Sequence, residues 1–104
     1  MANTFKNAGV AVGTSATTIY TAPAATTGII HAIYISNVDG TNDANVSITV
    51  TDTSAGATYH IMKTVAVPAD STLVIEKPIN LEPTDVLKAT ASVAGDIEAF
   101  VSVL

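Results

Sequence analysis

The 104-residue chain contains no cysteine, no tryptophan and no arginine. Without cysteine, neither a disulfide nor a thiol nucleophile is available. The positive charge comes from four scattered lysines, which nine carboxylates outnumber to give a net charge of −5. Because nucleic-acid binding needs clustered lysine and arginine to neutralise phosphates, we expect no nucleic-acid partner.

Charged residues are also scarce, at 12% of the chain, whereas hydrophobic residues reach 48%. The charged share is about half of the usual quarter. No apolar run approaches the 18 or so residues of a membrane-spanning helix, so we expect no membrane partner. The opening Met1–Lys6 lacks the basic start and apolar core of a secretory signal, which indicates synthesis in the cytoplasm.

Runs rich in Val, Thr and Ile recur along the chain, and glycine, proline or aspartate bounds them. Such runs, at a spacing of about 8–14 residues, are typical of short strands joined by turns. We expect about eight strands: 8–12, 16–21, 28–38, 45–51, 58–67, 71–76, 86–93 and 97–104, with 79–82 as an extended or edge segment. The sequence therefore predicts an all-β protein, a single antiparallel β-sandwich of residues 1–104, either jelly-roll-like or Ig-like. Residues 1–7 are expected to form either an N-terminal arm that reaches a neighbour or a frayed end.

The run from Gly28 to Val38 is the most apolar. Simple alternation puts Ile29, Ile33 and Ile35 on one face and leaves an apolar second face that includes Tyr34. Since both faces are apolar, we expect a central strand that is covered on both sides.

Only His31 and His60 offer a base for serine catalysis, and no G-x-S-x-G motif accompanies them. His31 is expected to be a buried, hydrogen-bonded imidazole in the core or in an interface. His60 is expected at the surface or in an interface. Their separation gives no metal signature, so we expect no catalytic residue and no zinc site.

The acidic groups give no stronger site. In the loop 39–43, Asp39, Asn42 and Asp43 offer oxygen ligands suited to calcium, but the spacing is not that of an EF-hand and a polar turn is favoured. The remaining candidate carboxylates are expected at turns and strand ends; they are Asp70, Glu76, Glu82, Asp85, Asp96 and Glu98. Few aromatic residues are available to line a sugar cleft, and no glycine-rich loop precedes a helix. We expect no metal, no cofactor and no enzymatic activity.

The outward positions of the expected strands carry mostly Thr, Ser, Asn and Ala. Solitary domains usually carry more surface charge, which keeps copies apart. A small, neutral surface of this kind packs closely against copies of itself or against a lattice. The composition therefore favours a homo-oligomer or a lattice-bound protein over an isolated monomer.

Several segments together resemble a family of small virion proteins of tailed bacteriophages. They are Phe5–Ala8, Val12–Gly13, Thr17–Pro23, Ile35–Thr41, Val65–Leu73 and Leu81–Ala89. The resemblance implies a structural protein of the virion without catalytic residues. It implies first a capsid decoration (cement) protein, which binds the major capsid protein at subunit junctions, often as a trimer. A neck, tail or fibre-associated protein is the first alternative, and a host-surface or glycan-binding module is the second.

Overall fold

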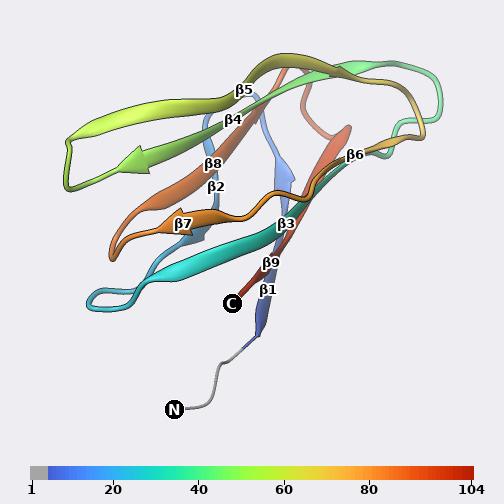
Figure 1. The fold of residues 1–104 in the computed structure, drawn as a ribbon. Coiled ribbons are helices and arrows are strands. Elements are labelled where there is room, and N and C mark those ends of the chain that lie inside the picture. The colour runs from blue at the N-terminus through green and yellow to red at the C-terminus, as the bar shows by residue number, and fades with distance from the viewer. Residues whose placement is uncertain (1–4) are drawn as a thin grey trace.

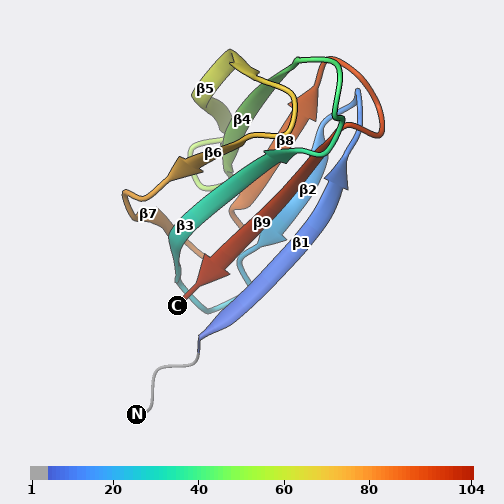
Figure 2. The ribbon, with the colours of Figure 1, turned by 90° about the vertical axis from the view of Figure 1, so that its right-hand side faces the viewer.

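The computed structural model describes residues 5–104, which form two antiparallel sheets packed face to face (Figures 1 and 2). The first sheet has the order β1-β9-β3-β6, and β7 pairs with β3 on the same side as β6. The second sheet has the order β2-β8-β4-β5. The strand bounds are β1 Lys6–Val12, β2 Thr17–Thr21, β3 Gly28–Asn37, β4 Ala44–Asp52, β5 Ala57–Val67, β6 Thr72–Ile75, β7 Ile79–Leu81, β8 Val86–Ala91 and β9 Ile97–Val103.

The pairing runs inward from the two ends of the chain: β1 with β9, β2 with β8, β3 with β6 and β7, and β4 with β5. A long hairpin rolled into two sheets in this way is a jelly roll. An Ig-like sandwich would place the first two strands in one sheet, whereas here β1 and β2 belong to different sheets. The predicted all-β sandwich is confirmed. The segment 79–82, expected to be extended, contains the strand β7, so the structure has nine strands where about eight were expected.

The core lies between the sheets and consists of the inward-facing residues of both. β-branched side chains favour the pleated backbone and fill this layer in alternate positions. The largest fully buried side chains are Ile30, Ile33, Ile35, Ile48, Leu81, Leu87, Ile97, Val12, Val46, Val67, Val101 and Val103. In the last strand, alternate residues from 97 to 103 belong to this layer: Ile97, Ala99, Val101 and Val103 are all buried.

A bulge interrupts β3 where it pairs with β9. Ile30 is opposite Val103, but the next partner, Ser102, is opposite Ala32. His31 is thus the additional residue, and an additional residue shifts the alternation of all later side chains. The bulge decides which face of β3 is buried.

The expected faces of β3 are wrong because of this shift. Ile30, Ile33 and Ile35 point into the core, whereas Ile29 and Tyr34 are exposed. The strand does lie inside its sheet, between β9 on one side and β6 and β7 on the other. Only one of its faces is covered, so an apolar surface remains open to solvent.

The β4–β5 hairpin reaches beyond the first sheet and lengthens the molecule, which measures 46 × 30 × 19 Å along its principal axes (Figure 1). Of the expected arm, residues 1–4 lie outside the described residues, and Lys6 and Asn7 are the first residues of β1. None of the residues in 5–104 forms a helix that is long and apolar enough to cross a membrane.

Candidate functional site

The two histidines lie on opposite sides of the sandwich. His31 is exposed on the first sheet, so the expectation of a buried core imidazole is wrong. It shares the outward face with Ile29, and the bulge moves the later residues Ile33 and Ile35 to the inward face. His60 is exposed, as expected, and lies opposite Thr49 in the second sheet. Both sheets separate the two imidazoles, which cannot act together on one substrate.

The loop 39–43 uses its carboxylates to hold its own backbone. Asp39 Oδ1 accepts hydrogen bonds from the backbone N–H groups of Thr41 at 2.7 Å and Asn42 at 3.2 Å. These donors stabilise the charged form and lower the pKa of Asp39. Asp43 Oδ1 accepts the N–H of Ala69 at 3.0 Å. The loop has the hydrogen bonding of the polar turn that the sequence favours.

Asp96 lies beside Asp39, where the turn between β8 and β9 meets this loop. The N–H of Val38 donates to the carbonyl oxygen of Asp96 at 2.8 Å. Partial burial raises the pKa of the Asp96 carboxyl, and the negative charge of Asp39 raises it further. The pKa of Asp39 therefore lies below its ordinary value, whereas the pKa of Asp96 lies above it.

Asn37 is a buried polar residue that the sequence analysis does not single out. Its Nδ2 donates to the carbonyl oxygens of Asn42 and Val67, each at 2.9 Å, and its Oδ1 accepts the N–H of Asp39. A buried amide keeps its place only when its polar atoms are satisfied in this way. Asn37 thus joins the loop 39–43 to the end of β5.

A second acidic group, formed by Asp52, Glu82 and Asp85, joins two turns. One carboxylate oxygen from each lies within 4.8 Å of the others. The Asp85 carboxylate accepts the N–H of Thr53 at 3.0 Å on Oδ1 and the N–H of Glu82 at 2.9 Å on Oδ2. Both oxygens are therefore used to tie the turn after β4 to the turn before β8.

Asp85 is a buried carboxylate, with only 4% of the residue exposed. Desolvation acts to raise the pKa of its carboxyl, but the hydrogen bonds from Thr53 and Glu82 outweigh it, and the pKa lies below the ordinary value. This is the behaviour of a structural carboxylate that remains charged. Glu82 and Asp85 lie in a turn, as expected, but the sequence did not indicate that they meet Asp52.

The outward face of the second sheet is polar, as the composition predicts. Opposite residues on neighbouring strands include Ser47 and Thr90, Thr49 and Lys88, and Thr51 and Thr58. The last pair shares a hydrogen bond between hydroxyl oxygens 3.1 Å apart. This face is rich in hydroxyl groups and short of apolar side chains.

The outward face of the first sheet is different. A single row of opposite positions crosses four strands, from Gly9 on β1 to Phe100 on β9, Tyr34 on β3 and Val74 on β6. Phe100, Tyr34 and Val74 are 44%, 39% and 40% exposed. Contiguous apolar side chains on an otherwise polar surface mark interaction sites in folded proteins. We name this row the apolar face; Ile29 is exposed on the same side of β3, five residues before Tyr34.

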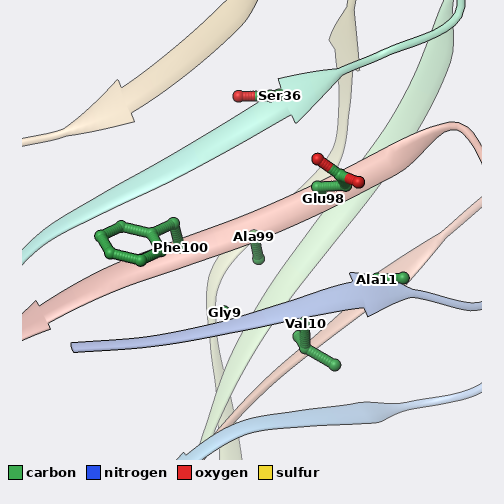
Figure 3. Close-up of a pocket in the computed structure, with 7 residues that line it drawn as sticks. All are labelled: Gly9, Val10, Ala11, Ser36, Glu98, Ala99 and Phe100. Atoms are coloured by element: carbon green, nitrogen blue, oxygen red, sulfur yellow. The ribbon is translucent and has the colours of Figure 1, made fainter.

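A hollow of about 370 Å³ opens beside the row, over β1 and β9 (Figure 3). Phe100 and Glu98 rise from the same side of β9. The opposite residues on β1 are Gly9 and Ala11, which are too small to fill the space between them. Ser36, on the neighbouring strand β3, is opposite Glu98. The hollow thus combines an aromatic ring, a carboxylate and a hydroxyl.

A scan against models of known protein families finds no match to this chain, and a search of curated proteins finds none either. The resemblance to small virion proteins therefore stays a hypothesis.

Proposed function

We propose that this chain is a structural protein of a virus particle and most specifically a capsid decoration protein that binds the major capsid protein. It would add a small β-sandwich in many copies to the outside of the lattice and hold neighbouring subunits together. Each contact can be weak, because symmetry repeats it and because one decoration protein can touch two subunits at once.

The observation that carries the proposal is the contrast between the two outward faces. One face is covered with hydroxyl groups, which suit exposure to water, whereas the other presents Phe100, Tyr34 and Val74. The buried centre of a protein–protein interface is enriched in aromatic residues and depleted of charged ones, as the row of Phe100 and Tyr34 is. Among the described residues, the histidines and the acidic groups form no arrangement that supports catalysis as well as this contrast supports docking.

The jelly roll is compatible with this function, since the architecture occurs in viral capsid domains. It also occurs in lectins, and a fold alone does not determine a function. The exposed rings of Tyr34 and Phe100, which are neighbours across β3 and β9, give the glycan-binding module a specific observation in its favour. Binding of the purified protein to a glycan array, lost in Tyr34→Ala, would favour that second candidate.

Quantitative mass spectrometry of purified particles tests the proposal by the number of copies of this chain per major capsid protein. A ratio near one to one or one to three is expected for a decoration protein. A dozen copies or fewer would instead indicate a neck, tail or fibre component. Absence from the particle would contradict any virion function.

A further inference from the structure

The hollow beside Phe100 lies where the first sheet has its single acidic side chain. Among the five strands of this sheet, Glu98 is the one carboxylate and Lys6 the one lysine. Lys6 is opposite Val103, whereas Glu98 is opposite Ala11. Five residues of extended strand separate Lys6 from Ala11, about 16 Å. The charge of Glu98 therefore stands on an apolar face without a cation from the same sheet beside it.

The shape of the hollow suits a long side chain with a positive end. Phe100 and Glu98 are two residues apart on one face of β9, a separation of about 7 Å. A lysine or arginine stem buries its methylene groups on apolar surface and extends its charge to a polar group. Here the stem would lie over Gly9 and Ala11, along the ring of Phe100, and its charged end would reach Glu98.

We propose that this hollow receives a lysine or arginine side chain from a partner protein whose surrounding surface is apolar. The inference rests on the proposed function, for which it specifies the docking face and the chemistry of the partner. A cation beside an aromatic ring gains electrostatic attraction, and a carboxylate adds a charge-assisted hydrogen bond. Tyr34 and Val74 would be covered by the apolar surface around the inserted side chain.

Charge also argues against a second copy of this chain as the occupant. Two copies that met through their apolar faces would bring together two Glu98 carboxylates but no lysine, because Lys6 is opposite the buried Val103 and so shares the inward side of its sheet. Like charges in a partly desolvated contact oppose association. A basic partner surface, in contrast, complements both Glu98 and the net charge of −5.

The test is an NMR titration of the full-length protein with the probe peptide acetyl-Leu-Arg-Leu-amide. The matched control is acetyl-Leu-citrulline-Leu-amide, which has nearly the same shape but a neutral end. We expect saturable shifts centred on Gly9, Ala11 and Phe100. We expect the arginine peptide to bind at least fivefold more tightly than the citrulline peptide. Glu98→Gln, at an exposed position, should remove that preference without changing the melting temperature.

Three outcomes would overturn the inference: equal binding of the two peptides, shifts centred away from the hollow, or no shift at all up to about 50 mM probe. A Kd of about 50 mM corresponds to a binding free energy of about −2 kcal/mol. Shifts at the same residues with N-acetylglucosamine, and none with the arginine peptide, would replace it with sugar binding. The particle copy number is measured separately. A protein that binds the peptide but is absent from particles would leave the inference standing and remove the proposed function. A protein that is present in particles at the expected ratio but does not bind the peptide would support the proposed function and overturn the inference.

Discussion

Phe100 lies across Gly9 on the outward face of the first sheet, so closely that a Cβ atom at position 9 would stand 3.2 Å from the Phe100 Cδ1. Glycine weakens a strand interior because it has no side chain to pack and loses more backbone entropy than other residues. The ring of Phe100 lies against this position and reduces what a side chain there would gain. The same small residue leaves the hollow open.

This relationship predicts a dependence between the two positions. Gly9→Ala should stabilise β1 by about 0.5–1 kcal/mol in a Phe100→Ala background, where nothing crowds the new methyl group. In the parent chain the gain should be smaller, because the ring must move by a few tenths of an ångström. Urea denaturation of the four proteins of this double-mutant cycle measures the difference. Equal gains in both backgrounds would show that the contact has no energetic effect.

The two faces of β3 should respond very differently to truncation. Ile33 is fully buried, so Ile33→Ala should lower the free energy of unfolding by about 2–5 kcal/mol through the cavity that it creates. The matched control is Ile29→Ala on the outward face of the same strand, where the loss should be about 1 kcal/mol or less. Chemical denaturation of both variants is the measurement. A larger loss at Ile29 would contradict the shift in alternation at His31.

The alternation in β4 and β9 was predictable from the sequence, because both strands keep one phase from end to end. In β3 the prediction failed at His31. A bulge is a mismatch between two paired strands, and a single strand carries no sign of it. The group of Asp52, Glu82 and Asp85 was missed for a related reason. Residues about 30 positions apart meet only through the sheet order, which local patterns do not encode.

The apolar face is not visible in the composition of the outward positions, because composition sums these positions over all strands of both sheets. The hydroxyl-rich positions belong mainly to the second sheet, and Phe100, Tyr34 and Val74 belong to the first. The hydroxyl-rich and the apolar positions become distinct only when each strand is assigned to its sheet. Simple alternation along the run 97–104 does put Phe100 on the opposite side from Val101, as the structure has it.

Asp96 should make the protein less stable as the pH rises. Its pKa is raised in the folded state, so the fold favours the protonated carboxyl; the corresponding stability is present below the ordinary value of 3.8 and is lost as the pH rises through the raised pKa. Asp96→Asn cannot ionise and should melt at a higher temperature than the parent at pH 7. The advantage should vanish near pH 3, where Asp96 is protonated. Thermal melts across this range check the prediction, and an advantage independent of pH would refute it.

Thr64 offers a place to stabilise the chain. Its φ of 52° lies in the left-handed region, which a β-branched residue enters only with strain. Glycine adopts that conformation freely, so Thr64→Gly should raise the free energy of unfolding by about 0.5–1 kcal/mol. Thr90→Gly, in strand β8 where the register with β4 is unbroken, is the control and should lower it. Denaturant midpoints that fall for both variants would show that the strain at Thr64 is negligible.

We propose that this protein reinforces a capsid by docking through its apolar face. The direct measurement is the temperature at which particles release their DNA, compared among native particles, particles lacking this chain and those particles after addition of purified protein. The release temperature should fall without the protein, recover with the parent chain and fail to recover with the Tyr34→Ser, Phe100→Ser variant. Particles that release DNA at the same temperature in all of these states would show that the protein does not reinforce the capsid.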